Sequence, residues 1–166
     1  KKCIDIGCGG GRYSKYLHQM KANVLAIDKY QEMFDHSSNI NFVQCKMDNI
    51  PVVENSYYLA LSIGVIHNAI TIEEYKNSLK EIYRILNKDG YAILSTFTND
   101  VITSDLIKTG ENTYLIKDRP PMVLLSKKQI QDYVSEVGFT IIKIVDEHIT
   151  DVGSGERNVY TILIKK

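Results

Sequence analysis

The feature that most constrains this chain is a short apolar strand that runs directly into a glycine-rich turn. Residues 3–11 read Cys-Ile-Asp-Ile-Gly-Cys-Gly-Gly-Gly, with four glycines in the last five positions. Glycine accepts positive φ and lets a ligand approach the main chain, and a helix that starts after the turn offers unpaired N–H groups. The junction therefore predicts a nucleotide-binding turn between a strand and a helix.

The spacing of these glycines indicates which nucleotide is bound. A dinucleotide-binding turn has the pattern Gly-x-Gly-x-x-Gly, but its third glycine position is occupied here by Arg12 in one register and Ser14 in the other. The sequence instead has an acid-x-Gly-x-Gly-x-Gly pattern that starts at Asp5 and ends at Gly11. In this pattern the chain resembles the class I S-adenosylmethionine-dependent methyltransferases.

Composition favours one domain and a small partner. The 166 residues are 44% hydrophobic, which suits a single globular domain over residues 1–166. Twenty basic and twenty acidic residues cancel, which argues against nucleic acid and anionic membranes as partners. Cys3, Cys8 and Cys45 have no metal-binding spacing, so no metal site is expected. Without a membrane span or signal peptide, we expect a cytoplasmic protein, either a monomer or a homodimer.

Strands and amphipathic helices alternate along the chain, which predicts an α/β fold with a mostly parallel sheet between two layers of helices. Strands are expected over 2–6, 23–27, 40–44, 58–63, 91–97, 139–147 and 158–165, and helices over 11–20, 30–37, 72–86 and 126–137. The last two strands have too short a connection for a crossover helix, so they should pair antiparallel. The resemblance implies a Rossmann-like, seven-stranded sheet of order 3-2-1-4-5-7-6 with strand 7 antiparallel. Members of the family usually carry one or two cap helices before the first strand, so we expect this sequence to be either a minimal version or one from which a segment is missing.

The resemblance assigns residues to the donor, S-adenosyl-L-methionine. Asp28, at the end of the second strand, is expected to accept hydrogen bonds from the ribose hydroxyls, although an acid there could instead cap a helix. Asp48 and Asn49 match the segment that contacts adenine, with a turn before Pro51 as the alternative. Asp5 either organises the turn or meets the methionine amino group. The remaining residues expected at the donor are Gly7, Cys8, Gly9, Gly11, Ile63 and Gly64.

Candidates on the acceptor side lie after the fourth strand and in two later loops. His67 is the first candidate for a general base, because it follows the fourth strand and its ordinary pKa is near neutrality; a packing role is the alternative. Tyr114 and Arg119 lie in the long loop after the fifth strand, and His148 and Arg157 lie near the connection between the last two strands. The arginines would suit an anionic acceptor, with a surface ion pair as the alternative.

These observations predict an enzyme that moves a methyl group from the sulfonium to a small-molecule acceptor by in-line displacement, leaving S-adenosyl-L-homocysteine. Because the sulfonium is already activated, positioning of the acceptor is the main task of the protein. Two alternatives stay open. One is a catalytically silent donor-binding or partner subunit, and the other is a nicotinamide-dependent oxidoreductase, which the glycine spacing disfavours.

Overall fold

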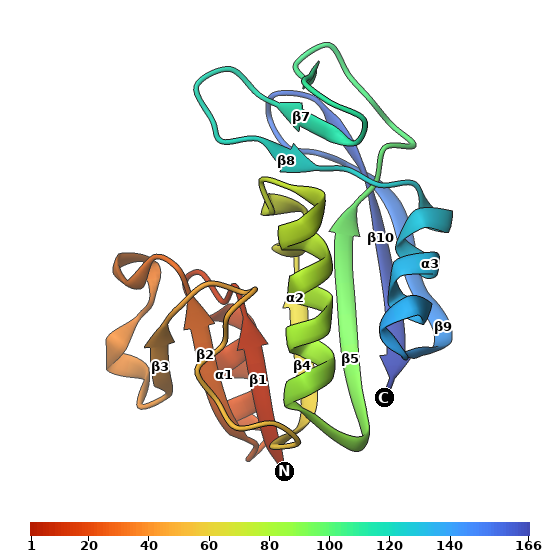
Figure 1. Ribbon diagram of the computed structural model, residues 1–166. Helices are drawn as coiled ribbons and strands as arrows, with labels where there is room; N and C mark the ends of the chain where they lie inside the picture. Colours follow the sequence, from red (N-terminus) through yellow and green to blue (C-terminus); the bar gives the residue numbers. More distant parts are fainter.

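The computed structural model describes residues 1–166, which form one large sheet, one small sheet and helices on both faces of the large one (Figure 1). The elements in chain order are β1 (Lys2–Ile6), α1 (Arg12–Gln19), β2 (Asn23–Asp28), η1 (Gln31–Met33), η2 (His36–Ser38), β3 (Asn41–Gln44), β4 (Tyr57–Ile63), η3 (Ile66–Asn68), α2 (Ile72–Ile85), β5 (Leu86–Phe97), β6 (Ile107–Lys108), β7 (Thr113–Leu115), β8 (Met122–Val123), α3 (Lys127–Val137), β9 (Thr140–Asp151) and β10 (Glu156–Lys165).

The large sheet has the strand order β3-β2-β1-β4-β5-β10-β9. Strands β1 to β5 pair in parallel, whereas β10 is antiparallel to both β5 and β9. This arrangement confirms the expected order and the reversed last strand. It also brings the carboxyl ends of β1, β2, β3 and β4 to one edge of the sheet, where ligands bind in open α/β folds.

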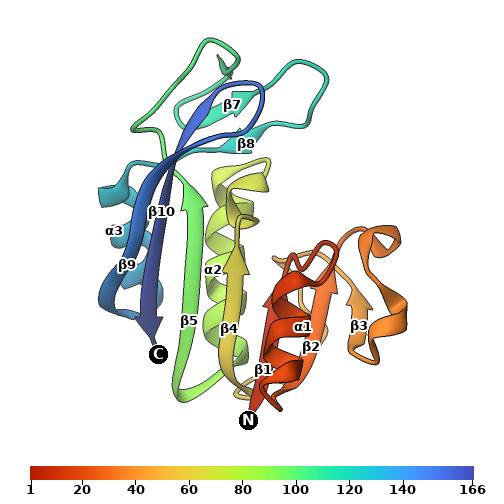
Figure 2. The ribbon, with the colours of Figure 1, turned by 180° about the vertical axis from the view of Figure 1, so that it is seen from behind.

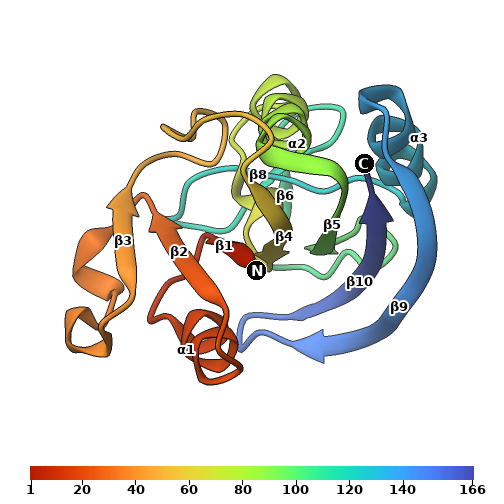
Figure 3. The same cartoon turned by 90° about the horizontal axis from the view of Figure 1, so that it is seen from below.

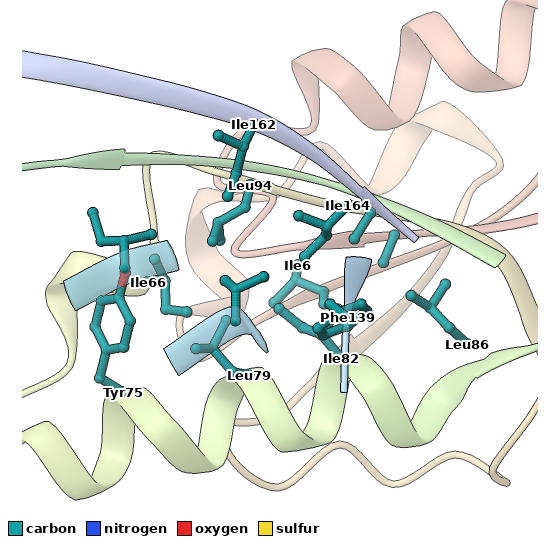
Figure 4. Packing of buried hydrophobic residues seen from close by; sticks show 14 of the residues in the cluster. Ile6, Ile66, Tyr75, Leu79, Ile82, Leu86, Leu94, Phe139, Ile162 and Ile164 are labelled. Carbon is teal, nitrogen blue, oxygen red and sulfur yellow. The ribbon is translucent and has the colours of Figure 1, made fainter. Parts of the chain in front are cut away.

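Helices α2 and α3 cover one face of the sheet and α1 covers the other (Figures 2 and 3). Figure 4 shows that Tyr75, Leu79 and Ile82 of α2 point toward the apolar side chains of the sheet, among them Leu94 and Ile162. All five are at most 1% exposed. Burial of an apolar side chain contributes about 1.5 to 3 kcal/mol, so this face fixes α2 against the centre of the sheet.

The helix boundaries follow capping residues. Thr71 caps α2 by accepting a hydrogen bond from the Glu74 amide. Ser126 and Gln129 form a complete capping box at the start of α3. Gly138 ends α3 with a φ of 114°, which a residue with a side chain rarely adopts. No helix in the structure combines the length and apolar character needed to cross a bilayer.

The expected helix over 30–37 is wrong. Two short 3-10 turns, η1 and η2, occupy this region instead. The Asp35 carboxylate accepts hydrogen bonds from both the amide and the hydroxyl of Ser37, and this local bonding competes with helical bonding. Asn39 then adopts a φ of 56° and ends the second turn.

The long loop after β5 contains a small antiparallel sheet, in the order β6-β7-β8, that the sequence pattern did not reveal. Leu106, Tyr114, Met122 and Leu124 form a separate apolar cluster within this region. Strands of two or three residues are too short to show an alternating pattern, which explains why they were missed.

Candidate functional site

The glycine turn links the end of β1 to the start of α1, and its backbone is fastened to β2. The amides of Gly7 and Cys8 both donate to the Ile27 carbonyl, at 2.8 and 3.0 Å. Gly7 has a φ of 68°, and a Cβ there would lie 2.2 Å from Cγ2 of Val65. Glycine is therefore required at position 7, because the backbone has positive φ and because Val65 packs closely against it.

Asp28 stands at the carboxyl end of β2 and connects the glycine turn to the next loop. Its Oδ2 accepts a hydrogen bond from the Gly9 amide and its Oδ1 accepts one from the Tyr30 amide, both at 2.9 Å. A carboxylate has about four lone-pair positions, so each oxygen keeps capacity for another donor. The two backbone bonds fix the orientation of the carboxylate beside a cavity that it lines.

This cavity has a volume of about 380 Å³ and lies at the carboxyl ends of β1 to β4. Four of the residues expected at the donor line it together: Gly7, Gly9, Asp28 and Gly64. A neighbouring cavity of about 550 Å³ shares Gly7 and is lined by Cys8 and Ile63, together with Arg12 and Tyr13. Asp5, Gly11, Asp48 and Asn49 line neither cavity.

Several cavity-lining residues were not predicted from the sequence. Apolar and aromatic side chains from the segments after β2, β3 and β4 form much of the wall: Tyr30, Met33, Cys45, Met47, Val65 and Ile70. Glu74, from the first turn of α2, also lines the cavity. The signal available in the sequence was the position of these residues just after predicted strands.

Asp5 is enclosed in the protein below the turn. It is 2% exposed, and its Oδ2 accepts a hydrogen bond of 2.6 Å from the Ser14 hydroxyl of α1. Burial raises the pKa of the Asp5 carboxyl, while the bonds from Ser14 oppose that rise. Asp5 thus connects β1 to α1 across the turn, which corresponds to the organising role left open by the sequence.

Asp48 and Asn49 follow the cavity-lining Met47. Asp48 Oδ1 is buried and has no hydrogen-bond partner in the protein. The Asn49 amide donates to the Lys46 carbonyl at 3.3 Å, so residues 46–49 form a turn. A buried acceptor without a partner costs about 1 to 3 kcal/mol, and the Asp48 oxygen borders neither cavity.

His67 lies in η3, three residues after the cavity-lining Gly64, and is 3% exposed. Its ring stacks on Phe97 with 4.1 Å between the ring centroids. The Phe97 amide donates a hydrogen bond of 3.2 Å to His67 Nδ1. Burial, with a smaller contribution from the nearby Arg157 cation, lowers the pKa of His67 to about 3. The imidazole is therefore neutral at physiological pH.

The other four candidates on the acceptor side form no side-chain hydrogen bonds with one another: Tyr114, Arg119, His148 and Arg157. Tyr114 packs in the apolar cluster of the small sheet, and Arg119 is exposed in the loop after β7. His148 Nδ1 lies 2.6 Å from Asp146 on the exposed edge strand β9. Arg157 is fully buried and forms an ion pair with Asp105. The sequence analysis had considered an ion pair for Arg157, but on the surface and without a named partner.

The three cysteines are free thiols. Burial raises the pKa of Cys8 to about 12 and that of Cys45 to about 11, so both stay protonated at neutral pH. Because the thiolate is the nucleophilic form, neither residue is an activated nucleophile. The chemistry of the cavity consequently depends on its carboxylates, backbone groups and apolar walls.

A sequence model of the family described as "Methyltransferase domain" matches residues 4–94, from β1 to β5. The chain belongs to this family. The matched segment contains the glycine turn, Asp28 and every strand end that borders the 380 Å³ cavity. The cavity is thus part of the methyltransferase domain and not an addition to it.

Solved structures share the fold of this methyltransferase domain at low sequence identity. An S-adenosylmethionine-dependent methyltransferase from Methanosarcina mazei has a TM-score of 0.86 and 17% identity, over 99% of this chain and 92% of that chain. The 1,6-didemethyltoxoflavin-N1-methyltransferase from Burkholderia thailandensis, solved with S-adenosylhomocysteine, has a TM-score of 0.74 and 19% identity, over 99% and 70%. The fold is that of the class I S-adenosylmethionine-dependent methyltransferases.

A curated relative covers a smaller part of the domain. The tRNA (carboxymethyluridine(34)-5-O)-methyltransferase ALKBH8 from Mus musculus is 32% identical over 95 residues. The match includes 54% of this chain but 14% of that protein. The matches between this chain and its curated relatives cover between 14% and 52% of the relatives' own length.

Proposed function

We propose that this chain is an enzyme that transfers a methyl group from S-adenosyl-L-methionine to a small-molecule acceptor. The observation that carries the proposal is Asp28, a carboxylate held by two backbone amides at the edge of a cavity of about 380 Å³. Its free lone pairs are suited to the two hydroxyls of a ribose. S-adenosyl-L-homocysteine is the product that leaves this cavity.

The backbone of the cavity fits the donor in a further respect. A Cβ at Gly64 would meet no atom within 4 Å, so the backbone there borders open space at a φ of 70°. Asp48 and Asn49 line neither cavity and remain the candidates for the adenine contact only through their place after the cavity-lining Met47. When bound, the donor provides an activated methyl group, and the residues of this chain hold it in place and exclude water.

The net charge of the chain supports a small-molecule acceptor. The chain has no net charge, whereas proteins that grip nucleic acid through phosphates commonly carry a strong excess of Lys and Arg. Because the Mus musculus relative is named as a tRNA methyltransferase, an RNA acceptor is the alternative that the experiment must separate. His67, Tyr114, Arg119, His148 and Arg157 remain the candidates on the acceptor side, with His67 nearest in sequence to the cavity wall.

The experiment uses a donor labelled in its methyl group and a cell extract divided into small-molecule, RNA and protein fractions. We expect label in the small-molecule fraction. Calorimetry should show that Asp28→Ala weakens binding of S-adenosylhomocysteine roughly 10- to 100-fold, as expected for lost charge-assisted hydrogen bonds. The matched control is Asp132→Ala, which removes an exposed acid from α3 and should leave binding unchanged.

Three results would contradict the proposal in different ways. Label confined to RNA would exclude the small acceptor but leave methyl transfer standing. Donor binding without transfer to any fraction would favour a catalytically silent subunit. Equal binding by Asp28→Ala and Asp132→Ala would show that the ribose contact is elsewhere.

A further inference from the structure

The second cavity, of about 550 Å³, lies beside the donor cavity and shares Gly7 with it. Its wall comes from the glycine turn, from Ile63 at the end of β4 and from the first turn of α1. Figure 2 shows that α1 begins at the edge of the sheet where β1 and β4 end. The donor cavity, at about 380 Å³, already has a volume within the range of small-ligand sites. The second cavity therefore provides room for another molecule next to the donor.

The charged side chains around the second cavity all carry the same sign. Arg12 and Lys15 line it, and no acidic residue does. The wall of the donor cavity instead mixes Asp28 and Glu74 with two lysines. A third cavity, of about 390 Å³ between α2 and α3, also mixes two lysines with Glu136. Of these three cavities, the second alone is lined by cations without acids.

Arg12 is the cation of this wall that keeps its charge free. Lys15 Nζ lies 2.7 Å from Asp35 Oδ2, so an ion pair neutralises it. Arg12 forms no ion pair: its guanidinium lies 4.8 Å from the centroid of the Tyr13 ring, and Nη2 donates to the Tyr13 hydroxyl at 3.1 Å. A guanidinium carries five N–H donors, so most of them remain available to a ligand.

From this geometry we infer that the second cavity holds the methyl acceptor, and that the acceptor is an anionic small molecule bound by Arg12 through an oxyanion, a carboxylate or a phosphate. This inference rests on the methyl transfer proposed above. The guanidinium presents parallel N–H donors that match two oxygens of such a group. The oxyanion serves to hold the molecule, and a different atom of the same molecule receives the methyl group.

The donor has a carboxylate of its own, on its amino-acid part, and this is the other oxyanion that an arginine here can bind. Arg12 does not line the donor cavity, whereas Lys29 and Lys46 do. Cations are therefore already present in the wall around the donor. This arrangement favours the acceptor as the partner of Arg12, and the first experiment separates the two carboxylates.

The first experiment measures binding on the donor side by calorimetry in the parent protein and in Arg12→Gln. The probes are S-adenosylhomocysteine, which carries the amino-acid carboxylate of the donor, and 5′-methylthioadenosine, which lacks it. We expect Arg12→Gln to bind both probes within about twofold of the parent, because the residue lies outside the donor cavity. A loss of about tenfold or more for S-adenosylhomocysteine alone would assign Arg12 to the donor and overturn the inference.

The second experiment determines the charge of the product. The protein is incubated with a methyl-labelled donor and the small-molecule fraction of a cell extract. Unreacted donor is removed by cation exchange, and the labelled products are applied to an anion exchanger at neutral pH. We expect the exchanger to retain the label. Phosphatase treatment then distinguishes a phosphate monoester, which loses its retention, from a carboxylate, which keeps it.

The third experiment uses the acceptor purified from that fraction. Arg12→Gln should raise KM roughly 10- to 100-fold with little change in kcat, because the lost guanidinium binds a part of the molecule that does not react. Arg12→Lys keeps the charge without the paired donors and should recover part of the loss. Lys128→Gln is the matched control, since it removes an exposed cation from α3 and should leave KM unchanged. Thermal melts report whether each variant is folded.

Label in products that the anion exchanger does not retain would overturn the anionic acceptor and leave methyl transfer intact. An unchanged KM in a folded Arg12→Gln would overturn the assignment of Arg12 and of the second cavity. Absence of label in every fraction would instead contradict the proposed function itself.

Discussion

At the scale of single residues, the donor site depends on backbone groups that are positioned by a few side chains. Asp28 aligns the Gly9 amide with the loop after β2, and Asp5 ties the same turn to α1 through Ser14. Gly7 leaves room for Val65, which follows β4 and lines the cavity. Substitutions at these positions therefore change the shape of the turn and not only one contact.

Gly7→Ala should destabilise the protein by more than about 2 kcal/mol, because positive φ costs about 1 to 2 kcal/mol and the new Cβ collides with Val65. It should also abolish detectable binding of S-adenosylhomocysteine. Chemical unfolding and calorimetry measure the two effects. Gly153→Ala is the matched control: its φ is 87° but nothing lies within 4 Å of the added Cβ. That variant should lose about 1 kcal/mol and bind normally.

At the scale of elements, an ion pair fastens the small-sheet region to the hairpin of β9 and β10. The Asp105 carboxylate accepts hydrogen bonds from Arg157, from Thr103 at 2.6 Å and from Ser154 at 2.9 Å. Arg157 also donates to the Glu156 carbonyl at 2.7 Å. Two segments that are distant in the sequence, residues 103–105 and 154–157, are thus joined around one buried guanidinium.

Arg157→Met should lower the free energy of unfolding by about 3 to 5 kcal/mol, since it leaves Asp105 largely buried without its partner. Lys128→Met, which breaks an exposed pair with Asp132, should cost less than about 1 kcal/mol. Urea unfolding compares the two variants at pH 7. Similar losses in both would show that the buried pair has no special contribution.

The same ion pair predicts a pH dependence. Because Arg157 lowers the pKa of Asp105 in the folded protein, the stabilisation is complete above the unfolded pKa of about 4. It is lost as the pH falls from that value toward the lower folded pKa. Unfolding measured from pH 5 to pH 2 should therefore show a smaller decrease in stability for Asp105→Asn than for the parent protein. An identical slope would contradict this assignment.

How well the sequence predicted each element depended on the length of its pattern. Helix α2 has apolar residues at helical spacing through four turns, and strands such as β4 and β10 are long enough to be recognised. The segment 30–37 failed because one carboxylate, Asp35, forms local bonds that no periodicity describes. In the site, the family resemblance identified Gly7, Gly9, Asp28 and Gly64, which line one cavity. The neutral state of His67 could not be predicted, because it depends on burial of the ring by segments that are distant in the sequence.

At the scale of the whole molecule, ligand binding and stability are linked. S-adenosylhomocysteine at about 100 times its Kd should stabilise the folded state by about 2.7 kcal/mol, which corresponds to a rise in Tm of roughly 5 to 10 °C. Reduced nicotinamide dinucleotide should not change the Tm. Differential scanning fluorimetry makes both measurements, and stabilisation by the nicotinamide alone would instead favour an oxidoreductase.

The two amide bonds to Asp28 have a consequence for the kinetics and affinity of binding. The carboxylate is already anchored, so in the donor complex proposed here a ribose would meet acceptors in their final orientation. Little conformational entropy remains to be lost at that side chain, and the favourable contacts translate more directly into affinity. Such a rigid receptor also predicts fast association with little rearrangement of the site.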